Sequence, residues 1–228
     1  MLGRYETQEY TVPVAGRVLR ILGPRWPHAL NDEPEYRRRS MEDGYKPLWA
    51  FPWPAAVMLV EHVLQSARVR PGRALELGAG LGIVGIALTL AGHRVIVTDY
   101  DEDALAFAHA SAALNGVRLC ETRRLDWRQP PQEQFDLIVA SEVAFDHRHH
   151  VPVVGLLSKC LAPEGQAFIS DTNRDAAEGF PAVVAAAGLA CTVARASARA
   201  IPAFDAVDGR VFKGRVFCIR RGGADERA

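Results

Sequence analysis

A short apolar run in this chain contains one carboxylate and is followed at once by glycines. The run is Ala74 to Leu77 with Glu76 inside it, and apolar residues resume at helical spacing from Ile83 to Leu90. The glycines between the two segments are Gly78, Gly80 and Gly82. Glycine lets a ligand approach the backbone closely and reaches positive φ, and a helix start offers free N–H groups at a positive dipole end. The pattern therefore predicts a strand, a tight ligand-binding turn and a helix.

A second carboxylate, Asp99, closes the next apolar run, Arg94 to Thr98. A carboxylate at the tip of a neighbouring strand suits a ribose diol. The spacing Gly80-x-Gly82-x-x-Gly85, with Asp99 about 20 residues along, also fits the dinucleotide pattern, in which the helix start receives pyrophosphate. Spacing alone therefore leaves three possibilities open: a dinucleotide site, a site for another nucleoside cofactor, and a glycine-rich turn without a ligand.

Two further motifs follow predicted strands. Asp126 and Trp127 come after a short strand from Arg118 to Arg123; they fit an adenine amino group and ring, or a turn residue and a packed aromatic. Ser141, Glu142 and Phe145 follow a buried strand that we expect from Phe135 to Ala140. Ligand crevices of open parallel sheets lie outside the carboxyl ends of the strands. We therefore expect Glu142 and Phe145 where chemistry takes place, the alternative for Glu142 being a surface carboxylate.

Aromatic and histidine residues offer two more candidates. The segment Pro47 to Pro54 is rich in aromatics and proline; its Trp53 either covers the edge of a core or lies beside a cationic ligand, an attraction of roughly 0.5–2 kcal/mol. Three histidines cluster after Phe145: His147, His149 and His150. They lack the i, i+4 pair of a helical metal site. We predict a solvated loop without metal there, and keep His147 as a candidate proton relay.

The elements that must position these residues alternate between strands and helices. We expect a β-hairpin of Glu9 to Val14 and Arg17 to Leu22, a long irregular connection from Gly23 to Pro47 that is typical of a lid or partner surface, and a helix opened by Pro54. Further helices are predicted at 101–115, with Asp101 as N-cap, at 151–161 and at 176–187, and further strands at 166–170, 191–194 and 211–220.

Composition restricts the class of protein. The chain has 228 residues with 27 basic and 27 acidic side chains, so no overall charge recruits nucleic acid or an anionic membrane. Four scattered cysteines without a C-x-x-C pair argue against a zinc site and a disulfide framework, and fit a reducing compartment. Neither a signal sequence nor an apolar run of the ~18 residues that span a membrane is present. We expect a cytoplasmic protein, with a monomer favoured.

Four separated motifs together resemble methyltransferase family 16, which belongs to the seven-β-strand S-adenosylmethionine-dependent methyltransferases. The pattern Glu-x-Gly-x-Gly-x-Gly from Glu76 resembles the first motif of that class, and Ser141 to Phe145 resembles the family's (Asp/Glu)-x-x-(Tyr/Phe) motif. The sequence Trp-Ala-x-x-Trp-Pro at 49–54 is similar to electron-transfer-flavoprotein β-subunit lysine methyltransferases and to bacterial nicotinamide N-methyltransferase-like proteins. The resemblance covers roughly Pro47 to Arg174. Glu142 and Phe145 depart from the Asp and Tyr of many members.

This resemblance implies a Rossmann-like fold with a mostly parallel seven-stranded sheet and an antiparallel C-terminal edge. It divides the chain into an N-terminal hairpin and irregular segment (1–46), a methyltransferase domain (47–221) and a tail expected to be disordered (222–228). The implied cofactor is S-adenosyl-L-methionine, with S-adenosyl-L-homocysteine as product. The implied cofactor-binding residues are Trp53, Glu76, Gly78, Gly80, Gly82, Asp99, Asp126, Trp127 and Ser141, and Glu142 and Phe145 would form the acceptor site.

The function implied by the resemblance is methyl transfer, with a protein lysine as the expected acceptor. Transfer from a sulfonium requires mainly positioning and desolvation by the protein. Glu142 would orient the lysine amine or relay its proton, and Phe145 would pack against the lysine stem. Three alternatives stay open: a small-molecule N-methyltransferase, an NAD(P)-dependent oxidoreductase and a non-catalytic cofactor-fold binding module.

Overall fold

The computed structural model describes residues 2–201 and 210–222, and within them seven strands form one sheet. The order across the sheet is β5-β4-β3-β6-β7-β9-β8. Neighbouring strands run parallel from β5 to β7, whereas β9 is antiparallel to both β7 and β8. The strands are β3 (Arg73–Leu77), β4 (Arg94–Asp99), β5 (Glu121–Arg124), β6 (Phe135–Ser141), β7 (Leu161–Asp171), β8 (Leu189–Arg199) and β9 (Val211–Arg221).

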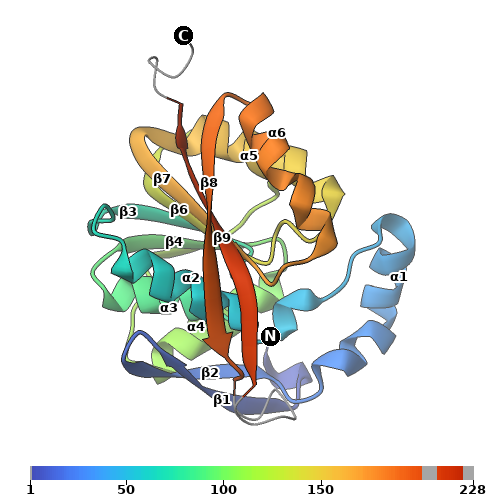
Figure 1. Ribbon diagram of the computed structural model, residues 1–228. Helices are drawn as coiled ribbons and strands as arrows, with labels where there is room; N and C mark the ends of the chain where they lie inside the picture. Colours follow the sequence, from blue (N-terminus) through green and yellow to red (C-terminus); the bar gives the residue numbers. More distant parts are fainter. Residues whose placement is uncertain (1, 202–209, 223–228) are drawn as a thin grey trace.

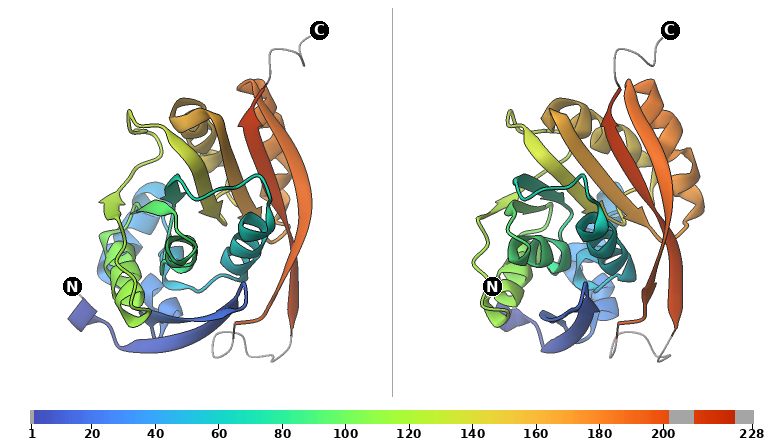
Figure 2. Two further views of the ribbon diagram at one scale, coloured as in Figure 1. Left: turned by 90° about the vertical axis from the view of Figure 1, so that its left-hand side faces the viewer. Right: turned by 60° about the vertical axis from the view of Figure 1, so that its left-hand side comes forward.

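Helices cover both faces of this sheet (Figures 1 and 2). Helices α2 (Pro54–Gln65), α3 (Ile83–Leu90) and α4 (Glu102–Leu114) lie on one face, and α5 (His147–Cys160) and α6 (Phe180–Ala186) on the other. Successive side chains of a strand point to opposite faces, so Val95 and Val97 pack in the core beside α2–α4 while Ile96 packs beside α5 and α6. The predicted α/β class with an antiparallel C-terminal edge is confirmed.

The N-terminal hairpin forms as expected from β1 (Thr7–Val14) and β2 (Arg17–Pro24). Its turn places Ala15 and Gly16 at φ 49° and 72°, the left-handed region that two-residue hairpin turns require. The hairpin is a separate sheet that lies against the helices rather than beside the central strands (Figure 2). The Ser111 hydroxyl of α4 accepts from the N–H of Leu22 at 3.0 Å and joins hairpin to helix.

The connection from Gly23 to Pro47 is more regular than predicted. It contains helix α1 (Pro34–Asp43) and three-residue-per-turn helices at Pro27–Asp32 (η2) and Leu48–Ala50 (η3), and similar short helices occur at Leu2–Arg4 (η1) and Asp175–Gly179 (η4). Only Tyr36 of α1 is buried, so the helix has no apolar stripe for periodicity to reveal. Its two ends did carry signals, because Pro34 stands at the first helical position and Gly44 closes the helix at φ 72°.

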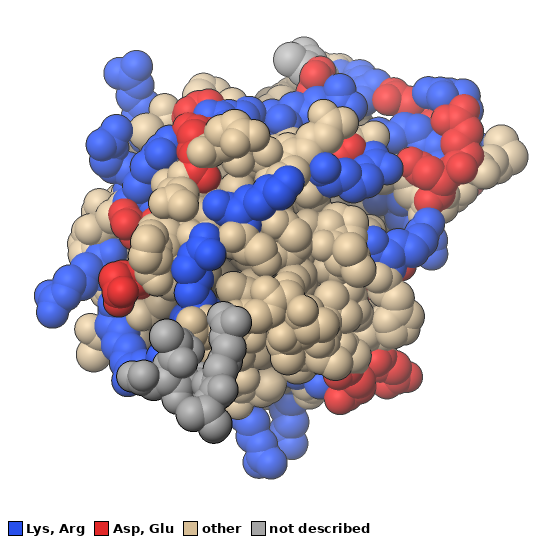
Figure 3. All heavy atoms as spheres, turned by 90° about the horizontal axis from the view of Figure 1, so that it is seen from above, with Lys and Arg blue, Asp and Glu red and all other residues tan. Residues whose placement is uncertain are grey.

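Three properties concern the surroundings of the protein. Within the described ranges, no helix combines the length and apolarity that crossing a bilayer requires. On the face seen in Figure 3, basic and acidic side chains are interspersed around an uncharged centre. The expected cytoplasmic location and the domain boundary after residue 46 stay predictions, and the expected disordered tail lies, apart from Gly222, outside the described residues.

Candidate functional site

The glycine-rich turn begins directly after β3 and ends where α3 starts. Gly78, Gly80 and Gly82 all have positive φ, at 63°, 54° and 87°, which side chains rarely adopt. Space is also limited: a Cβ on Gly80 would lie 3.0 Å from the carbonyl oxygen of Trp49, and one on Gly82 would lie 2.8 Å from Cβ of Ala108. Gly82 is therefore needed for the packing of the turn on α4 as well as for its conformation.

Asp99 fixes this turn from the neighbouring strand. The N–H of Gly80 donates to Asp99 Oδ2 at 2.9 Å, and the N–H of Asp101 donates to Oδ1 at 2.9 Å. Asp99 is 7% exposed, and burial raises its pKa to about 6. Each carboxylate oxygen has a second lone pair, so both can still accept from a ribose hydroxyl.

Glu76 lies under the turn and is 3% exposed. Burial raises its pKa to about 8, and the nearby Asp99 carboxylate acts in the same direction. Its Oε2 has no hydrogen-bond partner among the described residues. A Cβ on Gly85 would lie 2.4 Å from that oxygen, so the first turn of α3 must carry glycine to accommodate the carboxylate. The buried, unpaired oxygen suits a cationic ligand group.

The motif after β5 splits into an inward and an outward residue. Trp127 lies over the turn: a Cβ on Gly78 would be 3.3 Å from its ring, and Trp127 Nε1 is buried without a partner in the described part of the chain. Asp126 accepts from the guanidinium of Arg128, with the shortest distance 2.6 Å, and this pair lowers the pKa of Asp126. One Asp126 oxygen also accepts from the N–H of Arg128 at 3.0 Å.

The motif after β6 begins beside the glycine turn. The hydroxyl of Ser141 is buried and unpartnered within the described residues. Glu142 has φ 53°, and its N–H donates to Ser170 O at 2.9 Å. The left-handed backbone turns the chain sharply at the end of β6 and brings Val143 Cγ1 within 3.5 Å of the Cβ position of Gly78. The motifs after β3 and β6 therefore meet.

The Glu142 carboxylate is held by the loop that follows β7. Its Oε1 accepts from the N–H and the hydroxyl of Thr172 at 2.9 and 2.6 Å, and its Oε2 accepts from Arg174 Nε at 2.8 Å. Glu142 is 8% exposed. The sequence motifs assigned no role to Thr172 or Arg174, although both follow the carboxyl end of a predicted strand, the rule that did select Glu142.

Trp53 stands immediately before α2 and turns its indole N–H back to Leu48 O at 2.9 Å. Its ring lies against Phe51 at 5.3 Å between centroids, and the Arg174 guanidinium lies 5.6 Å from its centroid. Trp53 is thereby linked through Arg174 to Glu142, so the structure connects it to the acceptor motif.

The histidine cluster is not the solvated loop that we predicted. Helix α5 begins at His147, capped by Asp146, whose carboxylate accepts from the N–H of Arg148 at 2.9 Å. His149 Nδ1 lies 3.2 Å from Val143 O, and buried His150 Nε2 lies 2.9 Å from Ala144 O. Burial lowers the pKa of His149. Phe145 contacts the His149 ring edge-on at 5.1 Å, so the cluster braces the acceptor motif.

Helix α1 is fastened to the start of α4, next to Asp99. Arg39 Nη1 and the Tyr45 hydroxyl donate to Asp101 Oδ2 at 2.9 and 2.7 Å. The guanidinium of Arg39 lies 3.6 Å from the Tyr45 centroid. The predicted lid-like connection thus contacts the residue whose N–H binds Asp99.

Taken together, the turn has the polar atoms that a sulfonium amino-acid nucleoside requires. Three buried polar atoms around it lack partners among the described residues: Glu76 Oε2, Ser141 Oγ and Trp127 Nε1. Unpaired buried polar atoms are costly in a finished core and mark places where a ligand is bound. No group of three or more His, Cys, Asp or Glu side chains within the described ranges is arranged to hold a metal ion.

Comparison with known proteins gives relatives in one class. The chain is 29% identical over 160 residues to the protein N-terminal and lysine N-methyltransferase EFM7 of Cryptococcus neoformans, covering 62% of this chain and 53% of that one. It is 33% identical over 105 residues to the histone-arginine methyltransferase METTL23 of Homo sapiens, covering 41% and 54%. The chain thus spans about half the length of these curated relatives.

Solved structures agree on the fold. A ribosomal protein L11 methylase from Lactobacillus delbrueckii superposes with a TM-score of 0.56 at 22% identity, over 74% of this chain and 78% of that one. The family model described as lysine methyltransferase matches residues 41–180, more than half of the 228 residues. Family and fold imply S-adenosylmethionine as the methyl donor. On this match and the geometry of the turn, the chain belongs to the lysine methyltransferase family.

Proposed function

We propose that this protein transfers a methyl group from S-adenosylmethionine to a nitrogen of a protein, with a lysine side chain as the acceptor. The observation that carries the proposal is the meeting of two motifs at the carboxyl ends of β3 and β6. The Cβ position of Gly78, in the cofactor turn, lies 3.5 Å from Val143, in the acceptor motif. A donor and an acceptor held there are close enough for direct transfer, and proximity supplies much of the rate of such reactions.

On the donor side, each role follows from the family motif and the observed contacts. Glu76, Gly78 and Gly80 would receive the methionine end, where the unpaired Glu76 oxygen suits an ammonium group. Asp99 would accept from the ribose hydroxyls, and Asp126 and Trp127 would bind the adenine. Gly82 and Ser141 would complete the turn and the wall beside it. When bound, S-adenosylmethionine supplies an activated methyl group on sulfur.

On the acceptor side, the contacts of Glu142 favour orientation of the amine over proton uptake. A carboxylate has about four lone-pair sites. Three donors from Thr172 and Arg174 already use Glu142 oxygens, which leaves room for one N–H of an incoming amine. The adjacent Arg174 cation stabilises the ionised form. A lysine amine, with an ordinary pKa of about 10.4, would reach Glu142 and lose its proton before attack.

Aromatic side chains would bind the stem of that lysine. Phe145 lies beside His149, and Trp53 is linked to Glu142 through the guanidinium of Arg174. Apolar and π faces around a Glu carboxylate suit a methylene chain that ends in a cation. The relatives support a protein substrate, since their names include lysine, protein N-terminal and histone-arginine methyltransferase activities.

Calorimetry and labelling test the proposal. S-adenosylhomocysteine is expected to bind the purified chain, NAD is not, and the Asp99→Ala variant is expected to lose the binding. Labelled S-adenosylmethionine added to lysate with the protein should then mark protein bands, in which mass spectrometry finds methylated lysine. Binding of NAD alone would favour an oxidoreductase. Label confined to small molecules would favour a metabolite N-methyltransferase, and cofactor binding without any label would favour a binding module.

A further inference from the structure

A hollow of about 450 Å³ opens beside the residues that hold Glu142. It is lined by Thr172, Arg174, Arg210, Val211, Phe212 and Lys213, and we call it the basic groove. Thr172 and Arg174 are the donors to the Glu142 carboxylate. The basic groove therefore adjoins the acceptor side of the candidate site.

The charge of the basic groove is of one sign. Its lining contains three cationic side chains, Arg174, Arg210 and Lys213, and no carboxylate. The carboxylates nearest to the lining are already engaged: Glu142 is paired with Arg174 at 2.8 Å, and Asp171 with Arg215 at 3.1 Å. An anionic partner would meet an electrostatically complementary surface here, although the whole chain has no net charge.

One wall of the basic groove is an open edge of the sheet. Strand β7 pairs with β9 as far as Asp171 opposite Arg215. Strand β9 continues back to Val211, and the pairings of residues 211–214 in the described part of the chain are all with β8 (Figure 1). The other edge of those residues faces the space beyond the end of β7. An extended peptide can add to such an edge through main-chain hydrogen bonds.

We propose that the basic groove binds an extended, acidic segment of the acceptor protein next to the residue that is methylated. This inference rests on the proposed methyl transfer to a protein and deepens it. The open edge of β9 would bind the main chain of the segment, while Arg174, Arg210 and Lys213 would attract its Asp and Glu side chains. Val211 and Phe212 add apolar surface, which suits a peptide better than a phosphate backbone.

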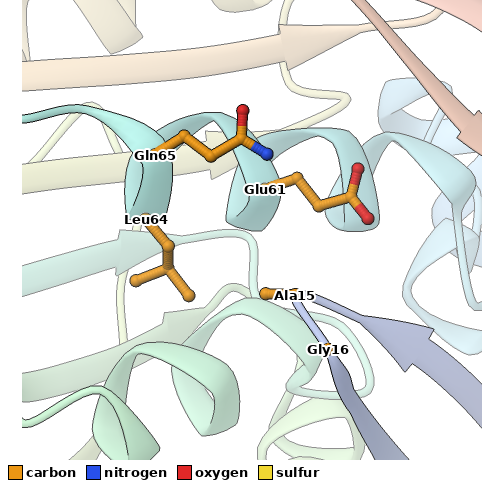
Figure 4. Close-up of a pocket in the computed structure, with 5 residues that line it drawn as sticks. All are labelled: Ala15, Gly16, Glu61, Leu64 and Gln65. Atoms are coloured by element: carbon orange, nitrogen blue, oxygen red, sulfur yellow. The ribbon is translucent and has the colours of Figure 1, made fainter.

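The other hollow of similar size lacks these features. Its volume is about 490 Å³, and Figure 4 shows it between the turn of the N-terminal hairpin and the last turns of α2. Ala15, Gly16, Glu61, Leu64 and Gln65 line it. Helix α2 runs into β3, so its last turns lie at the amino end of the sheet, away from Glu142. The comparison leaves the basic groove as the hollow that is placed to read an acceptor.

Direct binding tests the proposal on the whole protein with S-adenosylhomocysteine present. Three short fluorescent peptides share a central lysine and differ in having acidic, neutral or basic flanks. Measured by anisotropy, the acidic peptide should bind about tenfold more tightly than the neutral one, and the basic peptide more weakly still. The double variant Arg210→Glu/Lys213→Glu should reverse that order. The milder Arg210→Gln/Lys213→Gln should abolish the preference and serves if charge reversal impairs folding.

A matched control replaces two exposed arginines at the other end of the sheet. Arg94, the first residue of β4, and Arg118, which precedes β5, change to Glu in the control, which should keep the acidic preference. Equal affinity for the three peptides, or a preference that survives the Gln variant, overturns the inference. So does an oligouridylate that displaces the acidic peptide and depends on the same residues, since the groove would then be a nucleic-acid site. Calorimetry with S-adenosylhomocysteine separates the two levels: loss of cofactor binding contradicts the proposed function, whereas cofactor binding without flank preference contradicts only this inference.

Discussion

The donor and acceptor sides of the site are built in different ways. The donor side comes from a compact stretch between Glu76 and Asp99, and its key bond joins a main-chain N–H of Gly80 to the Asp99 carboxylate. The acceptor side joins Glu142 to Thr172 and Arg174, about thirty residues further on, mostly through side chains. A Trp53 ring from before α2 completes it.

This difference separates what can vary from what cannot. Changes at Gly78, Gly80 or Gly82 force a strained backbone or a steric clash, since φ is positive at all three positions. The acceptor side has side chains whose exchange leaves the strand ends in place. A chain built in this way can keep one methyl donor while its acceptor changes, and the relatives named for lysine, N-terminal and arginine methylation fit that expectation.

The largest effect is expected from breaking the donor side at Asp99. Asp99→Ala removes the anchor of Gly80 and the predicted ribose acceptor together, so the affinity for S-adenosylhomocysteine should fall by about a hundredfold or more. Calorimetry measures it. Asp136→Ala is the matched control, because Asp136 binds the N–H of Arg73 at the other end of β3. Retained affinity in Asp99→Ala would show that the turn forms and binds without this carboxylate.

A smaller effect, confined to the acceptor side, is expected from Glu142→Gln. The substitution keeps the shape of the side chain but removes the charge that Arg174 and the lysine amine would share. Methyl transfer to a protein acceptor should slow by roughly 10- to 100-fold, while cofactor affinity stays within about twofold. Initial rates and calorimetry on the same preparation separate the two. Glu164→Gln, an exposed change on β7, is the control, and a rate unaffected by Glu142→Gln would remove Glu142 from the site.

The pH dependence of cofactor binding sharpens the contrast further. Glu76 has a raised pKa of about 8, so the ligand-free protein holds it protonated at neutral pH. An ammonium group beside it favours the ionised form, so binding releases a proton and affinity should rise by up to about tenfold per pH unit until about pH 8. Asp99, with a pKa of about 6, adds to the rise below that pH.

Calorimetry across this pH range tests the linkage, with Glu76→Gln as the comparison. The variant should lose the part of the rise that ends near pH 8, leaving only what the ligand and Asp99 contribute. An affinity in the unchanged protein that is flat or falls with pH would contradict a cation beside Glu76.

The smallest effect is expected from Thr172→Val. It removes the hydroxyl that donates to Glu142 at 2.6 Å but keeps the N–H that donates at 2.9 Å. A lost neutral hydrogen bond is worth about 1 kcal/mol, so kcat/KM should fall about two- to fivefold with cofactor affinity unchanged. Steady-state kinetics beside Thr122→Val, on edge strand β5, checks it. A loss as large as that of Glu142→Gln would mean that Thr172 contacts the acceptor itself.

Much of the fold followed from local patterns. The hairpin, the strand–turn–helix around Gly78, the N-cap at Asp101 and the antiparallel edge were all predicted, because alternation, glycine spacing and capping residues act within a few positions. Helix α1 and the early start of α5 were not. Their faces are polar or mixed, and tertiary contacts such as Arg39 with Asp101 and His150 with Ala144 stabilise them.

The sequence by itself determined the class of fold, the family motifs and which carboxylates stand at strand ends. Only the tertiary structure decided their partners: that Glu142 is held by Thr172 and Arg174, that Trp127 covers Gly78, and that an open strand edge meets three cations beside the site. The physical reason is range. Backbone conformation depends on neighbours in the chain, whereas hydrogen bonds, burial and the pKa shift of Glu76 depend on segments that only folding brings together.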